Sequence, residues 1–197
     1  KKNDILLVFD EMQSGFGRTG EKFGFHHYKV SPNLVCCGKG MGSGYPLSGI
    51  IGDSKVLDLA PVGSLSSTHS ANPLACAAGL ATLEELNKKN LIKKSKILGE
   101  IMFSKLNELK KQFPMHIKHI SCKGLIAAII FKNENESNQG TILANKVCEK
   151  SLYEGLILVK TGRNSIKIGP PLIINKKQLI EGLNIIENML RKTVMND

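Results

Sequence analysis

The sequence of 197 residues has no tryptophan, only three tyrosines, and no apolar run near the ~20 residues needed to cross a bilayer. No membrane-spanning helix is therefore expected within this stretch. Aromatic side chains are too few for a base-stacking surface, and only three of the 27 basic residues are arginines, the type that base and phosphate recognition favours. The net charge of +10 therefore indicates a lysine-rich surface, with no nucleic acid and no membrane as partner.

The five cysteines contain no Cys-x-x-Cys pair, and their neighbours are mostly apolar. Adjacent Cys36 and Cys37 would point to opposite faces of a strand. We therefore expect small buried hydrophobes in a reducing, cytoplasmic compartment, and neither disulfides nor metal ligands. The sequence starts at Lys1 and enters an apolar run almost at once. We expect an N-terminal part to be missing, which leaves room for an organellar transit peptide upstream.

Apolar runs at 5–9, 33–37 and 47–52 are typical of strands buried on both faces of a parallel sheet. Asn72-Pro73 predicts the start of a helix that reaches about residue 89, and a long amphipathic helix follows it up to Phe113-Pro114. The rest predicts strands at 117–121 and 125–131, a polar loop at 132–139, a helix at 141–153, strands at 156–160 and 165–168, and a helix at 176–190. We therefore expect an α/β domain with a mostly parallel sheet over 1–92, and a small α+β domain over 93–197.

Two chemically reactive side chains stand at the ends of predicted strands. Asp10 ends the first run and opens a glycine-rich loop, and Lys39 follows the second run between Gly38 and Gly40. Ligands of open α/β sheets bind beyond the carboxyl ends of the strands. A lysine flanked by glycines at such an end is poorly explained by solvation and suits Schiff-base chemistry.

Other interpretations of these loops stay open. No Gly-x-x-x-x-Gly-Lys-Ser/Thr frame is present, and the glycines at 40, 42 and 44 lack the spacing of a dinucleotide fingerprint. The loop after Asp10 could be no more than a capped turn. The hydroxyl-rich segment 64–73, which leads into a helix N-terminus, fits either a phosphate site or an ordinary turn.

In combination and in order, these segments resemble the class-III aminotransferases, which include acetylornithine, ornithine and 4-aminobutyrate aminotransferases. The resemblance rests on Asp10-Glu11-Met12-Gln13-Ser14-Gly15-Phe16-Gly17-Arg18-Thr19-Gly20, on Lys39 in its glycine-rich loop, on Thr68 and Asn72-Pro73-Leu74-Ala75-Cys76-Ala77-Ala78-Gly79, on Lys123-Gly124-Leu125, and on Gly169-Pro170-Pro171-Leu172-Ile173. It implies the fold type I arrangement of pyridoxal-phosphate enzymes, with a large domain and a small C-terminal one. Members are considerably longer, so this chain resembles their C-terminal half. They act as homodimers with the active site at the interface.

The resemblance also assigns roles to individual residues. Lys39 would bind pyridoxal 5'-phosphate as an internal aldimine and Asp10 would pair with its ring nitrogen, which makes these two the catalytic residues. Gln13 would contact the phenolic oxygen, Met12 the face of the ring, and Thr68 the phosphate held by the neighbouring subunit. Glu11, by contrast, is expected to order the loop.

The resemblance leaves the substrate open. Relatives place an arginine shortly before the Pro-Pro pair to bind a substrate carboxylate, whereas this sequence has Lys167, with Arg163 nearby as a possible substitute. Residues 66–70 also differ from the usual pattern. We expect transamination between an amino acid or ω-amine and a 2-oxo acid. The alternatives are a related aminomutase or decarboxylase, or an inactive truncated fragment.

Overall fold

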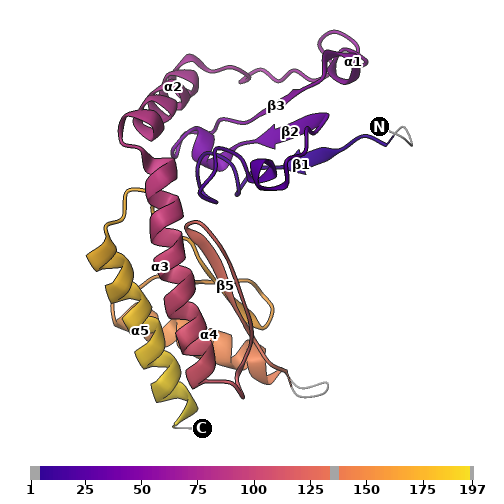
Figure 1. Cartoon of the computed structure of the whole chain (residues 1–197). Coiled ribbons are helices and arrows are strands. Elements are labelled where there is room, and N and C mark those ends of the chain that lie inside the picture. The colour runs from indigo at the N-terminus through magenta and orange to yellow at the C-terminus, as the bar shows by residue number, and fades with distance from the viewer. Residues whose placement is uncertain (1–4, 134–137, 196–197) are drawn as a thin grey trace. The chain divides into compact units, whose positions relative to one another are not determined.

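The computed structural model describes residues 5–133 and 138–195 of the chain. Contacts divide it into two compact units, Lys1–Lys93 and Lys94–Asp197 (Figure 1). Residues 134–137 of the predicted polar loop lie outside the described residues. Among those described, no helix combines the length and the apolar character that crossing a membrane requires.

The first unit contains a three-stranded sheet in the order β1 (Val8–Asp10), β2 (Leu34–Cys37) and β3 (Gly49–Gly52). β1 pairs with β2 in parallel, whereas β3 pairs with β2 antiparallel. The prediction of a mostly parallel sheet is therefore wrong for these three strands. The reason is the connection: a parallel crossover needs about a dozen or more residues, usually with a helix. Residues 38–48 contain only the short 3-10 helix η2 (Lys39–Met41) and a glycine-rich turn, so the chain folds back.

The expected burial of the first strand is also not found in this chain. Ile5, Leu6, Leu7 and Val8 are 41–70% exposed, even though Leu7 is held to the sheet by a hydrogen bond from Asn33 N to its carbonyl oxygen (2.8 Å). The described residues therefore leave these apolar side chains uncovered. An apolar run shows that a strand suits burial, but which segment covers it depends on the rest of the fold.

The first unit also has the 3-10 helix η1 (Gly24–Tyr28), the short α1 (Ser54–Leu57) and α2 (Pro73–Lys88). The predicted start of α2 is confirmed, because Asn72 Oδ1 accepts hydrogen bonds from Leu74 N (3.0 Å) and Ala75 N (3.4 Å). One buried-cysteine prediction is wrong: Cys76 is exposed. It lies one position beyond Ala75, which belongs to the buried side of the helix.

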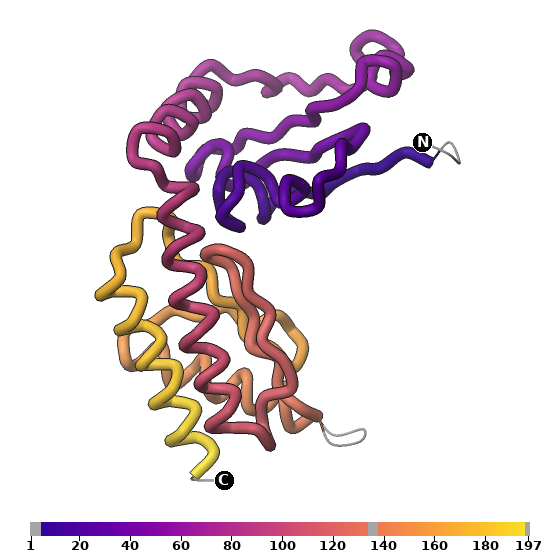
Figure 2. The backbone as a smooth tube through the Cα atoms, in the orientation of Figure 1, coloured from indigo at the N-terminus to yellow at the C-terminus, as the bar shows by residue number. Residues whose placement is uncertain are grey.

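The second unit packs helices against a four-stranded antiparallel sheet, whose backbone is traced in Figure 2. α3 (Leu91–Gln112) leads into it. The sheet has the order β4 (Ile117–Lys123), β5 (Ile126–Phe131), β7 (Ser165–Ile168) and β6 (Val159–Lys160). The remaining helices are α4 (Gln139–Tyr153) and α5 (Lys176–Val194). The predicted strand at 156–160 is shorter than expected, because only its last two residues pair with β7.

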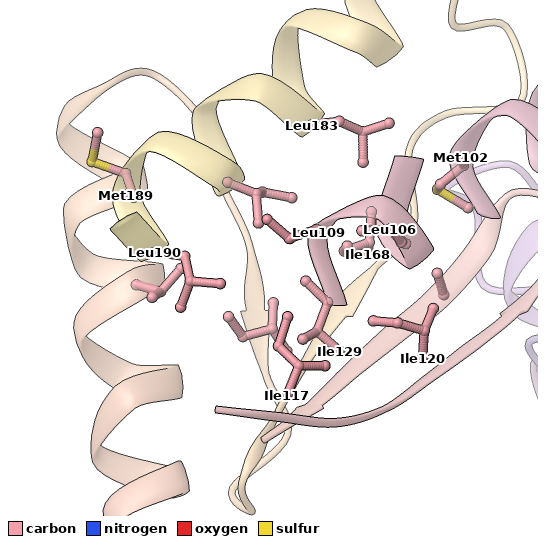
Figure 3. Close-up of a cluster of buried hydrophobic side chains, with 14 of the residues drawn as sticks. Met102, Leu106, Leu109, Ile117, Ile120, Ile129, Ile168, Leu183, Met189 and Leu190 are labelled. Carbon is pink, nitrogen blue, oxygen red and sulfur yellow. The ribbon is translucent and has the colours of Figure 1, made fainter. Parts of the chain in front are cut away.

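Side chains at helical and strand spacing form the core of the second unit (Figure 3). Helices contribute Met102, Leu106, Leu109, Leu183, Ile186 and Leu190, and strands contribute Ile117, Ile120, Ile129, Phe131, Ile166 and Ile168. The amphipathic character predicted for the helix that precedes Phe113 is therefore confirmed, and α5 also buries one face in this core.

Two glycines let α3 approach the β4–β5 turn closely. A β-carbon on Gly99 would lie 2.5 Å from backbone atoms of Gly124, which itself has a positive φ of 55°. One turn earlier in α3, the hydroxyl of buried Ser95 accepts a hydrogen bond from Leu125 N (3.3 Å). The segment Lys123-Gly124-Leu125, which contributed to the family resemblance, thus shapes the packing of the second unit.

Candidate functional site

Asp10 ends β1 with an exposed carboxylate, opposite Cys36 of β2. Its Oδ1 accepts a hydrogen bond from the backbone N–H of Met12 (3.0 Å). This contact, two residues along the chain, is the local turn that aspartate favours where a strand ends. The carboxylate is therefore held in place at the end of β1 and remains accessible.

Lys39 is the first residue of η2, which follows β2 after Gly38, and its side chain is exposed. Its backbone has φ of +46°, a left-handed conformation that is uncommon outside glycine. The turn is closed by hydrogen bonds from Met41 N to Gly38 O (3.0 Å) and from Gly42 N to Lys39 O (3.3 Å). Such backbone strain persists only when surrounding structure holds it, and it is concentrated at functional sites.

β1, which ends at Asp10, and β2, which ends shortly before Lys39, are direct neighbours in the sheet. β1 and β2 are parallel, and Glu11 N donates a hydrogen bond to Cys36 O (2.9 Å), so their pairing continues past Asp10. Since parallel strands end at the same edge of a sheet, both side chains belong to one edge of the first unit.

Met12 connects the two strand ends. A β-carbon on Gly38 would lie 2.5 Å from Met12 Sδ and 3.4 Å from its Cε. Because Gly38 has no side chain, the thioether of Met12 has room beside it. Gly38 is the residue that directly precedes Lys39. This gives Gly38 a steric role, since its extended φ of 179° is one that any residue adopts.

Glu11 is a buried side chain with several hydrogen-bond partners next to Asp10. It is 1% exposed, and three donors converge on its carboxylate. Phe25 N donates to Oε1 (2.8 Å), while Gly24 N (2.9 Å) and Ser14 Oγ (2.5 Å) donate to Oε2. Both backbone donors belong to η1, so Glu11 ties the end of β1 to a helix thirteen residues further along.

The two remaining predicted cofactor contacts lie in loops. Gln13 is exposed, three residues after Asp10. Thr68 is exposed in a turn that precedes α2, and this turn is closed by a hydrogen bond from Ser67 N to Ser70 Oγ (3.0 Å). The sequence prediction that Thr68 stands shortly before a helix N-terminus is confirmed, whereas its contact with a phosphate stays a prediction.

Lys167 and Arg163 both belong to the second unit but to different parts of a hairpin. Lys167 lies within β7 between Ile166 and Ile168, whose side chains are buried in the core. Because side chains alternate along a strand, Lys167 points to the other face of the sheet. Arg163 is exposed in the turn before β7. The two cations therefore belong to different parts of the hairpin, one to the strand and one to the turn.

All five cysteines are free, and the residues that the structure describes contain no group of three or more His, Cys, Asp or Glu suited to a metal ion. Burial raises the pKa of the Cys122 thiol to about 11, and it is also the main cause of the raised pKa of Cys37 and of Cys148. These three thiols are therefore poor nucleophiles at neutral pH.

Two features of the site were not predicted as contacts. The sequence identified Glu11 only as a residue that orders the loop, and it gave no sign of its donors at Gly24 and Phe25. The sequence did offer one signal: if the extended chain continues past Asp10, the side chain of Glu11 points to the side opposite to that of Asp10. No sequence pattern indicated the fit of Met12 against Gly38.

Comparison with known proteins matches nearly the whole chain to one protein family. The family model described as aminotransferase class-III matches residues 1–190. An alanine/serine racemase of Pyrococcus horikoshii is 38% identical over 96% of this chain and 40% of its own length. A probable 4-aminobutyrate aminotransferase of Bacillus subtilis is 38% identical over 97% of this chain and 44% of its own. The crystal structure of acetylornithine aminotransferase from Elizabethkingia anophelis superimposes with a TM-score of 0.86 at 31% identity, covering 97% of this chain and 47% of that one. The chain thus spans less than half the length of these relatives.

Proposed function

Because this chain belongs to the class-III aminotransferase family, whose members use pyridoxal phosphate, we propose that it carries the lysine and the ring-nitrogen carboxylate of a transaminase. The observation that carries the proposal is the placement of Asp10 and Lys39. Both are exposed: Asp10 is the last residue of β1, and Lys39 follows the parallel neighbour β2 after Gly38. A carboxylate and an amine at one sheet edge suit a cofactor that must be held at its ring nitrogen and at its aldehyde.

Asp10 would act on the ring nitrogen. An ionised carboxylate accepts a strong, charge-assisted hydrogen bond from a protonated nitrogen and so keeps the proton there. The cofactor, when bound, supplies an electron sink whose strength depends on that proton. The hydrogen bond from Met12 N restrains Asp10, which reduces the reorganisation needed to bind the ring.

Lys39 would hold the cofactor covalently through Nζ and, once released by an amino substrate, would move a proton as a general base. Its position directly after β2 restricts where its side chain can reach. Met12 would contact the ring face and Gln13 the phenolic oxygen. Thr68, in its exposed turn, would reach the phosphate held by the neighbouring subunit of a homodimer.

We propose amino-group transfer between an amino acid or ω-amine and a 2-oxo acid as the overall reaction of the full-length protein. Lys167 is the proposed contact for a substrate carboxylate, with Arg163 as the alternative. In this proposal the chain supplies part of a large domain and a small C-terminal domain of fold type I, and it is inactive as this fragment alone.

A second candidate function is amino-acid racemisation. The 38% identity to the alanine/serine racemase supports it, since that protein is as similar to this chain as the probable aminotransferase of Bacillus subtilis is. Both reactions begin by removing a proton from the substrate carbon, so Asp10 and Lys39 would serve either one. They differ in whether a second substrate is consumed.

The proposal is tested on the full-length protein expressed with pyridoxal phosphate. Borohydride reduction, which makes a link between cofactor and lysine permanent, is followed by peptide mapping. We expect the label on Lys39 and no label in Lys39→Ala. A label on another lysine would overturn the proposal. Further assays then separate the possible reactions. Keto-acid formation that requires a 2-oxo acid indicates transamination. Inversion, isomerisation or carbon dioxide release without a 2-oxo acid indicates racemisation, isomerisation or decarboxylation.

A further inference from the structure

We propose that Glu11 is a positioning residue, which sets the geometry of Asp10 and Met12 without itself touching cofactor or substrate. The inference deepens the proposed function and rests on the roles given there to Asp10 and Lys39. It is carried by a buried carboxylate that neighbours Asp10 in sequence and is fully engaged with a different part of the first unit.

The side chain of Glu11 lies inside the protein, away from the accessible edge. Adjacent residues of an extended chain point to opposite sides, and Asp10 is exposed whereas Glu11, the first residue after β1, is 1% exposed. The hydrogen bond from Glu11 N to Cys36 O holds the backbone of Glu11 beside β2. A backbone rotation at Glu11 would therefore move Asp10 as well.

All three partners of the Glu11 carboxylate are donors. An ionised carboxylate only accepts hydrogen bonds, and Gly24 N, Phe25 N and Ser14 Oγ all donate to this one. The two backbone donors are at the start of η1, where N–H groups have no partner within the helix. The arrangement stabilises both the buried charge and the helix start.

The surrounding glycines show how closely the loop wraps around this side chain. A β-carbon on Gly24 would lie 3.2 Å from each Glu11 carboxylate oxygen, and one on Gly15 would lie 2.9 Å from the Glu11 carbonyl oxygen. That carbonyl accepts a hydrogen bond from Gly15 N (3.0 Å). Glu11 is therefore enclosed through both its side chain and its backbone.

Glu11 is linked to both proposed reactive residues through Met12. Peptide bonds join Glu11 directly to Asp10 and to Met12. The N–H of Met12 orients Asp10, and its sulfur packs beside Gly38, the residue before Lys39. A shift of about 1 Å at reacting groups can lower a rate about 100-fold, so a small relaxation here would be measurable.

The test compares Glu11→Gln with Glu84→Gln in the full-length holoenzyme. Glutamine keeps the size of the side chain, but its NH₂ group must face at least one backbone N–H of η1, so one donor loses its partner. Glu84 is an exposed carboxylate on α2 and serves as the matched control. For Glu11→Gln we expect kcat per cofactor-loaded site to fall about 10- to 100-fold with KM changed less than about threefold, while the control stays at the wild-type values.

Two further measurements separate positioning from plain structural support. The pH midpoint of the cofactor absorbance should shift in Glu11→Gln, because Asp10 would no longer be held in the same place. In the apoprotein, amide exchange should rise at residues 10–14 as well as at 24 and 25. A merely structural role would lower thermal stability while kcat per loaded site and the absorbance titration stay unchanged, and that result would overturn the inference.

Ser14→Ala keeps the test decisive if Glu11→Gln does not fold. It removes one of the three donors and leaves both backbone donors in place, so a smaller change in the same direction is expected; no change in kcat or in the titration would count against the inference. Borohydride mapping of the wild-type protein separates the two possible failures. A label on Lys39 with unaltered Glu11→Gln rejects only the role of Glu11, whereas a label elsewhere rejects the proposed function.

Discussion

Met12 Sδ lies 2.5 Å from the position that a β-carbon on Gly38 would take, so the loop after β1 and the turn after β2 fit together only because residue 38 has no side chain. This relationship links the segment that carries Asp10 to the one that carries Lys39. It also explains why a methionine can stand at this position: its thioether is long and adaptable enough to reach across to the neighbouring strand end.

Substitution of Gly38 by alanine should displace the side chain of Met12 and destabilise the protein only slightly. The methionine arm can swing away, so we expect a loss of about 1 kcal/mol in unfolding free energy, together with a roughly tenfold lower kcat. Denaturant unfolding and steady-state kinetics of the full-length enzyme measure the two effects. Gly49→Ala is the matched control, since nothing lies within 4 Å of a β-carbon there. In a Met12→Ala background the effect of Gly38→Ala should largely disappear.

Replacement of Lys167 by methionine should raise KM for the carboxylate-bearing substrate about tenfold and leave kcat nearly unchanged. Methionine keeps the length of the side chain and removes the charge. Arg163→Met provides the comparison, because that side chain lies in the turn and not in β7. A larger KM effect at Arg163 than at Lys167 would reverse the proposed order of the two cations.

Alanine at Gly99 should destabilise the second unit despite its better helix propensity. The exchange gains about 1 kcal/mol of propensity, but the new β-carbon would lie 2.5 Å from the backbone of Gly124, which cannot swing aside. Forcing α3 from the β4–β5 turn costs about 1–3 kcal/mol, and we expect a net loss in unfolding free energy. Gly182→Ala is the control in α5: its β-carbon would meet Leu156 Cδ1 at an ordinary 3.4 Å, so this variant should be neutral or more stable.

The raised pKa of Cys122 predicts a loss of stability at alkaline pH. Burial raises the pKa of this thiol from 9.0 to about 11, so the folded chain keeps the proton over a range in which the unfolded chain has lost it. The stabilisation is fully present below pH 9 and is lost as pH rises through 11.

Urea unfolding of wild type and Cys122→Ala at pH 8 and pH 10.5 measures this effect. The difference between the two proteins isolates the thiol from lysines and tyrosines that titrate in the same range. We expect the wild type to lose more stability between these pH values than the variant does. Cys76→Ala, at an exposed position, should follow the wild type, and equal pH dependence in all three proteins would contradict the prediction.

Several elements could be predicted from local sequence because they depend on local physics. The amphipathic pattern of α3 and the Asn72 cap of α2 describe interactions within a few residues of chain. The direction of β3 was predicted wrongly, because an apolar run does not specify whether its strand pairs parallel or antiparallel. The exposure of Ile5 and Leu6 likewise depends on which segments cover the sheet, which their own residue types do not specify.

For the candidate site, the sequence by itself determined which residues can do chemistry: a carboxylate and a lysine, each directly after an apolar strand and each followed by glycines that permit tight turns. Only the tertiary structure decided that their strands are parallel neighbours, that Met12 fits against Gly38, and that Glu11 is held by donors from η1. The physical reason is distance along the chain. Residue type and spacing encode contacts within a few residues, whereas these contacts join segments 13 to 26 residues apart, which meet only when the sheet has formed.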